Sequence, residues 1–448
     1  MSTVTQDAAG EFLVEQQGAS LLRLATAGSV DDGKSTLVGR LLHDSKSILA
    51  DQLDAVERVS RSRGLEGPDL ALLTDGLRAE REQGITIDVA YRYFATARRS
   101  FVLADCPGHV QYTRNTVTGS STADAIVLLV DVRHGVLEQT RRHLAVAALL
   151  RVPQVIVAVN KIDLVGFDPA AFDQVEAQVR EVAEDLGIPA LTVIPVAALL
   201  GDNVVDHSAN TPWYHGPALL ELLEELPTAD LPEAEAFRFP VQYVLRPQAA
   251  ALSPEFVEYR GYAGQVASGV VRVGDEVVAL PSGRRVCVEG IDTADGSRAE
   301  AFAGESVTLR LSDDIDLARG DLIAAADDAP EPAKELDAFV CWLNERPLRA
   351  GAKVLLKHTT RTVRAQVREI DGRLDLDSLT SEPGESLELN DIGRVKIRLA
   401  GEVAAEPYAR SRRTGSFLLI DADSGQTLAA GMVTGARAER RSDADWVI

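Results

Sequence analysis

A short glycine-flanked loop, GSVDDGKST (residues 28–36), combines the residue types that bind phosphate. It follows the apolar run LLRLA and precedes LVGRLL, so a strand and a helix are expected on its two sides. Gly28, Gly33, Lys34 and Ser35 satisfy the spacing G-x-x-x-x-G-K-[ST]. Backbone N–H groups and a helix N-terminus cradle the anion, the lysine reaches the β- and γ-phosphates, and the hydroxyl is placed to bind Mg²⁺. The other loop residues expected at the nucleotide are Ser29, Val30, Asp31, Asp32 and Thr36.

A second cluster, Asn160-Lys161-Ile162-Asp163, is expected directly after a buried strand. At this position the carboxylate of Asp163 can accept two N–H donors, from N1 and N2 of guanine. Adenine lacks that donor pair and would leave a buried acid unpaired. Following a phosphate loop in this order, Asn160, Lys161 and Asp163 predict that the nucleotide is GTP.

A third motif, Asp105-Cys106-Pro107-Gly108-His109, also ends a predicted strand. Asp105 is placed to hold Mg²⁺ through a water molecule, and the N–H of Gly108 can bond a γ-phosphate that is lost on hydrolysis. We expect His109 to orient the attacking water. Cys106 is interpreted as a small buried residue beside the nucleotide, and Pro107 belongs to the same site.

The tetrapeptide GITI (residues 84–87) lies between two of these phosphate motifs. Thr86 is the residue expected to close over Mg²⁺ while the γ-phosphate is present, ordering a loop that relaxes after hydrolysis. The predicted metal ligands are Ser35, Thr86 and, through water, Asp105. The predicted catalytic residues are His109, Lys34 and Thr86.

A fifth motif, Ala197-Ala198-Leu199, stands where GTPases place a Ser-Ala loop against the base. Backbone N–H groups of such a loop can meet guanine O6. Because Ala197 replaces the serine, we expect some loss of loop rigidity but no loss of specificity.

The elements that must position these motifs alternate along the first half of the chain. Apolar strands are expected near residues 21–25, 100–105, 125–131, 154–160 and 191–196, with helices between them. This pattern predicts a mostly parallel α/β sheet with helices on both faces. Beyond it, breaks near residues 227–240 and 324–337 separate two blocks of short alternating strands, including one at 256–269, which predict two small all-β barrels. The predicted domains are an N-terminal extension (1–20), a GTP-binding domain (21–228) and barrels at 236–328 and 334–442.

Composition restricts the class of protein. The 448 residues carry a net charge of −22, which repels nucleic-acid backbones and argues against nucleic acid as a partner. We find no apolar run long enough for a membrane span and no basic-then-apolar secretory signal near the start. The three cysteines are far apart and predict neither a disulfide framework nor a metal cluster, so we expect a cytoplasmic protein.

The domain order and the motifs GITI and DCPGH resemble those of the translational GTPases, above all elongation factor Tu, over roughly residues 21–433. Those factors usually read G-H-V-D-H-G-K-[ST], whereas Ser29 and Asp32 replace both histidines here. GSVDDGKSTLVGRLLHDSK is instead similar to the large, GTPase subunit of bacterial sulfate adenylyltransferase (the CysN type). The similarity extends to TDGLRAEREQGITIDVAYRYF, to residues 105–143 and 199–224, and to RRTGSFLLIDADSGQTLAAGMV.

That resemblance implies a heterodimer or higher heteromer. A small catalytic subunit of the adenine-nucleotide α-hydrolase type would make adenosine 5′-phosphosulfate and pyrophosphate from ATP and sulfate. GTP hydrolysis on the large subunit would drive that transfer. Some relatives carry a fused C-terminal kinase for adenosine phosphosulfate, and no second P-loop is found in this sequence.

Two other functions stay open at this point. The first is an elongation factor-like GTPase acting on tRNA or the ribosome, which the acidic balance and the missing histidines disfavour. The second is a nucleotide-gated scaffold with negligible hydrolysis, which the set of Lys34, Thr86 and His109 opposes. By analogy with elongation factor Tu, Val30 and Ile85 form either an apolar gate for His109 or ordinary packing.

The β blocks carry no chemical motif. Asp313-Asp314-Ile315-Asp316 is read as an acidic turn in preference to a cation site. Trp213 and Trp342 are read as packing residues in preference to ligand stackers.

Overall fold

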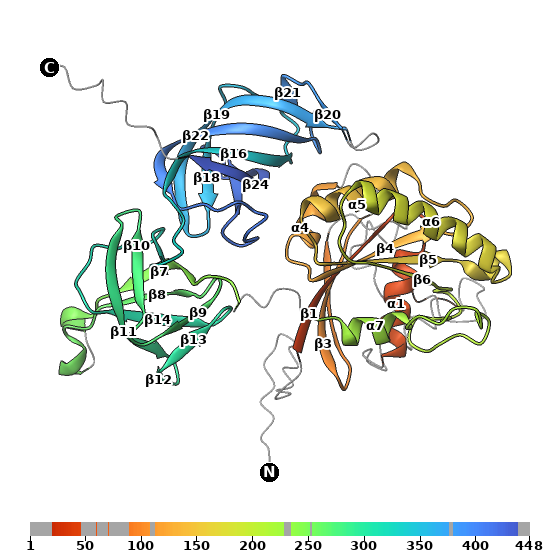
Figure 1. The fold of residues 1–448 in the computed structure, drawn as a ribbon, viewed down its shortest axis with the longest axis horizontal. Coiled ribbons are helices and arrows are strands. Elements are labelled where there is room, and N and C mark those ends of the chain that lie inside the picture. The colour runs from red at the N-terminus through yellow and green to blue at the C-terminus, as the bar shows by residue number, and fades with distance from the viewer. Residues whose placement is uncertain are drawn as a thin grey trace, which may run out of the picture. The chain divides into compact units, whose positions relative to one another are not determined.

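The computed structural model describes residues 20–45, 60, 70, 89–107, 113–227, 234–250, 253–375 and 380–437. The chain divides into two compact units, one of residues 1–108 with 115–229 and one of residues 109–114 with 230–448 (Figure 1). Within the described ranges no helix combines the length and the apolarity needed to span a membrane.

The first unit is built on a six-stranded sheet in the order β2-β3-β1-β4-β5-β6. Only the β2–β3 pair is antiparallel, and the other neighbours run parallel. Strand β4 is buried along its whole length, as expected for a parallel strand covered on both faces. The strands are β1 (Ser20–Gly28), β2 (Ala90–Ala95), β3 (Arg99–Asp105), β4 (Ala125–Asp131), β5 (Gln154–Asn160) and β6 (Leu191–Pro195).

Helices cover both faces of this sheet (Figure 1). Helices α1 (Lys34–Asp44) and α7 (Leu219–Glu225) share one apolar core with alternate residues of the strands. Helices α5 (Glu138–Leu149) and α6 (Pro169–Asp185) pack on the other side, where α4 (Thr113–Ser120) also lies, and a 3₁₀ turn, η3 (Ile162–Val165), follows β5. The predicted mostly parallel α/β fold is confirmed.

The second unit holds two closed antiparallel barrels. In the first barrel the ring runs β10-β15-β7-β8-β14-β11 and closes through a β10–β11 pairing. Its strands are β7 (Arg238–Leu245), β8 (Gly261–Gln265), β10 (Glu276–Leu280), β11 (Arg284–Thr293), β14 (Ser306–Leu311) and β15 (Leu322–Ala325). Its short elements are η4 (Gln248–Ala250), η5 (Pro254–Phe256), β9 (Val270–Arg272), β12 (Gly296–Arg298) and β13 (Glu300–Phe302).

In the next barrel the ring runs β18-β23-β24-β16-β22-β19 and closes through a β18–β19 pairing. Its strands are β16 (Ala333–Trp342), β18 (Lys353–His358), β19 (Arg361–Leu374), β22 (Ile392–Val403), β23 (Ser416–Ile420) and β24 (Thr427–Arg437). Its short strands are β17 (Leu348–Arg349), β20 (Ser381–Glu382) and β21 (Ser386–Leu387). The prediction of two all-β barrels after the α/β domain is confirmed.

The bounds of three segments predicted from the sequence, two breaks and one strand, are wrong. The break placed at 227–240 ends earlier, because Phe237, Phe239 and Val241 alternate into the core of the barrel. Strand β15 likewise runs into the break placed at 324–337, and β16 begins inside it. The strand expected over 256–269 is confined to β8. In the two breaks, proline and acidic residues hid a period-two pattern that the barrels bury.

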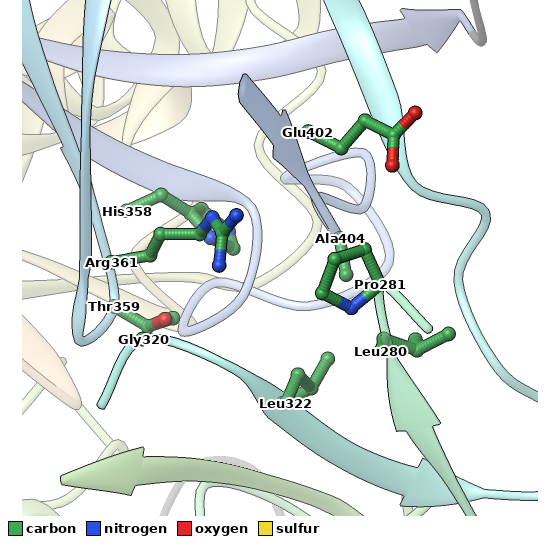
Figure 2. A pocket seen from close by; sticks show the side chains of 9 residues that line it. All are labelled: Leu280, Pro281, Gly320, Leu322, His358, Thr359, Arg361, Glu402 and Ala404. Atoms are coloured by element: carbon green, nitrogen blue, oxygen red, sulfur yellow. The ribbon is translucent and has the colours of Figure 1, made fainter. Parts of the chain in front are cut away.

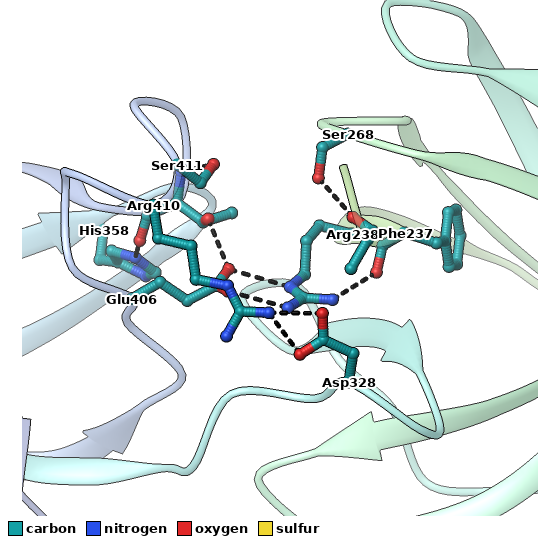
Figure 3. A network of polar contacts seen from close by, with 10 residues as sticks. Phe237, Arg238, Ser268, Asp328, His358, Glu406, Arg410 and Ser411 are labelled. Atoms are coloured by element: carbon teal, nitrogen blue, oxygen red, sulfur yellow. Dashed lines mark hydrogen bonds and ion pairs between the residues drawn. The ribbon is translucent and has the colours of Figure 1, made fainter. Parts of the chain in front are cut away.

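A polar network joins the two barrels (Figure 3). Arg238 of β7 donates from Nε and Nη2 to the two carboxylate oxygens of Glu406, at 2.9 and 2.8 Å, and both side chains are buried. The Thr414 hydroxyl donates to the same carboxylate at 2.7 Å. Nearby, Arg410 pairs with Asp328. The two barrels are therefore fastened by a bidentate ion pair that is shielded from water.

A cavity of about 10 Å³ lies where these barrels meet (Figure 2). Its lining residues are Leu280, Pro281, Gly320, Leu322, His358, Thr359, Arg361, Glu402 and Ala404. That volume is about one water molecule, so the cavity cannot take a larger ligand.

The side chains that the sequence assigned to packing do pack. Trp342 is buried in the core of the last barrel, and Trp213 lies 5.4 Å from the ring of Phe172. Asp314 is exposed and pairs with Arg260 at 3.1 Å. No group of three or more His, Cys, Asp or Glu able to hold a metal occurs among the described residues.

Each of the three domains contains one free cysteine. Cys106 directly follows β3 in the first unit and is buried, Cys287 on β11 is exposed, and Cys341 on β16 is buried.

Candidate nucleotide-binding site

The predicted motifs gather at one edge of the α/β sheet, where the parallel strands β1, β3, β5 and β6 end. The carboxyl ends of parallel strands form the usual ligand edge of such sheets. The loop from Gly28 to Gly33 leaves β1, Asp105 closes β3, Asn160 closes β5, and Ala197 follows β6. The sheet therefore places these motifs along a single edge.

Two glycines set the path of the phosphate loop. Gly28 has φ +148°, and a Cβ there would lie 2.9 Å from the carbonyl oxygen of Leu129. Gly33 has φ +93°, and its Cβ would lie 2.5 Å from Nδ2 of Asn160. A side chain at either position would clash with a neighbouring strand end, so the close approach requires glycine.

Lys34 opens helix α1 with its side chain folded under the loop. Its Nζ donates to the carbonyl oxygens of Gly28 at 2.9 Å and Ser29 at 3.0 Å, and the residue is buried. Burial lowers the pKa of the ammonium, and the carboxylates of Asp105 and Asp32 oppose that shift. The helix itself starts without a side-chain cap and without an acidic residue in its first turn. A buried cation beside uncapped N–H groups is the donor set that a polyphosphate fits.

The two aspartates of the loop make different contacts. The Asp32 carboxylate accepts the N–H of Ser29 at 2.8 Å and is buried, and burial raises its pKa. Asp31 has φ +65°, and its carbonyl oxygen accepts a hydrogen bond from Lys161 at 2.5 Å. Asp32 therefore ties the loop internally, in a role that the sequence alone did not reveal.

The remaining loop residues differ in exposure. Val30 is exposed, whereas Ser35 and Thr36 are half-buried at the start of α1. The buried hydroxyl of Ser29 finds no hydrogen-bond partner among the described residues.

Asp105 lies buried at the end of β3. Its Oδ1 accepts the hydroxyl of Thr26 at 2.9 Å, and the N–H of Cys106 donates to the Thr26 carbonyl at 3.2 Å. Burial raises the pKa of the Cys106 thiol. Pro107 is buried beside it. Thr86, Ile85, Gly108 and His109 lie outside the described residues.

Asn160 connects the two halves of the site. Its amide Nδ2 donates to the carbonyl of Asp32 at 2.7 Å, and its Oδ1 accepts the N–H of Ala198 at 3.0 Å. One buried side chain thus joins the phosphate loop to the loop that follows β6.

Asp163 and Lys161 follow Asn160 on the base side. The Asp163 carboxylate is half-buried and accepts no hydrogen bond from the described residues, so both oxygens are available to a ligand. Lys161 pairs with Asp131 at 2.9 Å. Burial alone would raise the pKa of Asp131, but hydrogen bonds from Arg133 and Lys161 lower it well below its usual range.

The loop after β6 is a tight turn. Ala197 and Ala198 are buried, whereas Leu199 is 68% exposed. The Ala197 carbonyl accepts the N–H groups of Leu200 at 3.1 Å and Gly201 at 2.7 Å. Backbone hydrogen bonds therefore close the turn without a serine hydroxyl.

Reasoning from sequence missed several residues of this site, chiefly Thr26 and His143. His143 on α5 is buried beneath the loop, where its ring bonds to the backbone of Gly28 and to Gln139 at 3.2 Å. Burial, followed by the charge of Lys34, lowers its pKa to about 3. The sequence signal for it is slight, since a lone histidine on the apolar side of a helix carries no motif.

Comparisons with known proteins agree with this geometry. Residues 19–229 match the family model "Elongation factor Tu GTP binding domain", and residues 335–434 match "GTP-eEF1A C-terminal domain-like". The bifunctional enzyme CysN/CysC of Mycobacterium tuberculosis is 52% identical over 416 residues, covering 92% of this chain and 67% of that protein.

In two further relatives, a larger share of the relative's own length matches this chain. Sulfate adenylyltransferase subunit 1 of Shewanella oneidensis is 48% identical over 437 residues, covering 96% of this chain and 88% of that protein. The subunit of the same name from Cellvibrio japonicus is 46% identical over 424 residues, covering 94% and 88%. The chain belongs to the family of sulfate adenylyltransferase subunit 1, whose first domain here is of the elongation factor Tu GTP-binding type.

Proposed function

We propose that the chain is the GTPase subunit of a heteromeric sulfate adenylyltransferase. The observation that carries the proposal is the contact made by Asn160. Its amide bridges the phosphate loop and the loop that follows β6 (residues 197–201, the base loop) at one edge of the sheet. A site with both halves joined in this way fits a whole nucleotide. The open carboxylate of Asp163 supports guanine as the base.

Lys34 would exchange its two loop carbonyls for the oxygens of the β- and γ-phosphates. The uncapped N–H groups of α1 would hold the same phosphates. Because the helix fixes these N–H groups before the ligand arrives, they can stabilise charge that develops on the leaving phosphate. His109 would orient the attacking water.

The oxygen donors of Ser35 and Asp105, with Thr86, fit the preference of Mg²⁺ for hard ligands. Bound there, Mg²⁺ would neutralise charge on the β- and γ-phosphates. Thr26 supports this role by donating to Asp105, which fixes the orientation of the carboxylate.

The relatives named sulfate adenylyltransferase subunit 1 support a role in sulfate activation. The partner would be a small catalytic subunit that forms adenosine 5′-phosphosulfate and pyrophosphate from ATP and sulfate. For GTP hydrolysis to drive that reaction, the partner must bind the GTP and GDP states with different affinity, since equal affinity couples nothing.

The test is to purify the chain together with the small subunit and to measure phosphosulfate formation with and without GTP. We expect GTP to stimulate synthesis, and we expect Lys34→Ala to abolish the stimulation while the two subunits still associate. Lys353→Ala, on the exposed face of β18, is the matched control and should retain it. Synthesis that ignores GTP, or a chain that forms no complex, would overturn the proposal.

A further inference from the structure

Arg40, on the second turn of helix α1, contacts the loop that follows β6 (residues 197–201). Its Nε donates to the carbonyl oxygen of Ala198 at 3.2 Å, and its Nη2 donates to that of Leu199. The side chain is 19% exposed and also lies 3.6 Å from the carboxylate of Asp44. Arg40 therefore ties the helix that starts at the phosphate loop to the turn that follows β6.

The carbonyls of Ala197, Ala198 and Leu199 all have partners. The Ala197 carbonyl accepts two backbone N–H groups within the turn, and Arg40 takes the next two carbonyls. Among the N–H groups, that of Ala198 is held by Asn160. The N–H of Leu199 finds no acceptor among the described residues, so it is the open donor of the turn.

The planarity of the peptide bond couples the direction of the Ala198 carbonyl to that of the Leu199 N–H. The Ala198 carbonyl and the Leu199 N–H belong to one trans peptide unit, in which C=O and N–H point in opposite directions. Holding the carbonyl on the guanidinium therefore fixes the direction of the N–H. The stem of Arg40 also packs 3.7 Å from the position that a Cβ of Gly201 would occupy, which limits movement of the turn.

We propose that Arg40 is a positioning residue for base recognition, and that it aims the Leu199 N–H at the 6-oxo group of the purine. It replaces with two hydrogen bonds the stiffening that a serine at position 197 would give. The inference rests on the proposed GTP site. It adds that readout of the purine 6-position depends on a helix residue outside all five predicted motifs.

The test compares three nucleotides on the full chain. 6-Thio-GTP keeps the N1 and 2-amino donors but carries a weak sulfur acceptor at position 6, whereas ITP keeps the 6-oxo group and lacks the 2-amino group. We expect Arg40→Met to weaken GTP binding roughly five- to tenfold, the worth of about one hydrogen bond. The GTP preference over 6-thio-GTP should fall toward one, while the preference over ITP should stay at its wild-type value.

Three variants separate positioning from general stability. Arg180→Met removes an arginine that pairs with Glu176 four residues before it on α6, and it should change neither ratio. Asp44→Asn removes the ion pair of Arg40 but keeps both carbonyl bonds, so it should bind like the wild type. Arg40→Lys, with a single ammonium donor, should restore part of the 6-position preference.

Different results would overturn the role of Arg40 and the proposed function. If Arg40→Met weakens all three nucleotides by one common factor, or leaves the 6-thio ratio unchanged, Arg40 is only a packing residue and the inference fails. If the wild-type chain shows no preference for GTP, the proposed function itself fails.

Discussion

At the scale of single residues, two buried side chains lie beside the backbone of Gly28. The Lys34 ammonium donates to the Gly28 carbonyl at 2.9 Å, and His143 approaches the same residue from α5. The charge of Lys34 and the burial together keep the imidazole neutral, with a pKa of about 3. The start of the phosphate loop is thus held from beneath by a neutral histidine.

His143 should make the stability of the first domain depend on pH. In the unfolded chain its pKa is near 6.5, so between pH 6.5 and about 3 the unfolded state binds a proton that the folded state cannot. Stability is therefore lost as pH falls below 6.5. By pH 5 the loss from this group is about 2 kcal/mol.

His143→Gln removes that term. The variant should be less stable than the wild type at pH 7.5, and the gap should shrink by about 2 kcal/mol at pH 5. Urea unfolding at the two pH values measures it, with the exposed His215→Gln as the control for losing a histidine. A gap of equal size at both pH values would contradict this account.

The motifs of the candidate site can be read from the sequence more readily than the side chains that hold them in place. The spacing of Gly28, Gly33 and Lys34 is visible because it is local, as is the run from Asn160 to Asp163. The bond from Asp32 to Ser29 N–H is also local, but an acidic letter in a phosphate loop does not say where its oxygen points. Thr26, Arg40 and His143 come from other elements, and only the fold brings them to the loop.

At the scale of elements, Arg99 of β3 anchors the end of α7. Its Nη1 donates to the carbonyls of Leu223 at 2.9 Å and Leu226 at 2.6 Å, and the residue is buried. Those carbonyls belong to the last turn of the helix and have no partner further along it. A cation there also faces the negative end of the helix dipole.

Arg99→Met should therefore destabilise the first domain by about 3 kcal/mol, since two charge-assisted hydrogen bonds are lost and two carbonyls stay buried. Thermal unfolding of the full chain reads the change. The neighbouring Arg98 pairs with Glu224 at 3.2 Å but is 60% exposed, so Arg98→Met should cost well under 1 kcal/mol. Equal effects of the two substitutions would show that the helix end is not anchored in this way.

The elements themselves were predictable where their periodicity is strong. The five apolar runs of the sheet stand where the sequence placed them, because fully buried strands need unbroken apolar residues. The edges of the barrels were not predictable, because the residues of β7 and β16 that enter the barrel cores stand at alternate positions within segments rich in proline and acid.

At the scale of the whole molecule, Arg238 and Glu406 hold the two barrels together. Because both are buried, removing one partner leaves an uncompensated charge in the interface (Figure 3). We expect Arg238→Met to cost about 3–5 kcal/mol of stability. The double variant Arg238→Met with Glu406→Met should recover most of that loss, since replacing both charges leaves none unpaired.

Unfolding by denaturant, followed through tryptophan fluorescence, to which the buried Trp342 of the last barrel contributes, measures both effects. Arg285→Met is the control, because Arg285 forms an exposed pair with Glu276 within one barrel. If the double variant is no more stable than the single one, the ion pair does not account for the joint between the barrels.

The three free thiols can report local opening of the protein through their rates of chemical labelling. Cys287 is open to solvent and would react with a thiol reagent at once, whereas Cys106 and Cys341 are sealed inside the first and third domains. A buried thiol reacts only when the structure around it opens locally. The labelling rates of Cys106 and Cys341 therefore report local opening of the first and the third domain. A nucleotide bound over Lys34 would slow the labelling of Cys106 and leave the labelling rate of Cys341 unchanged.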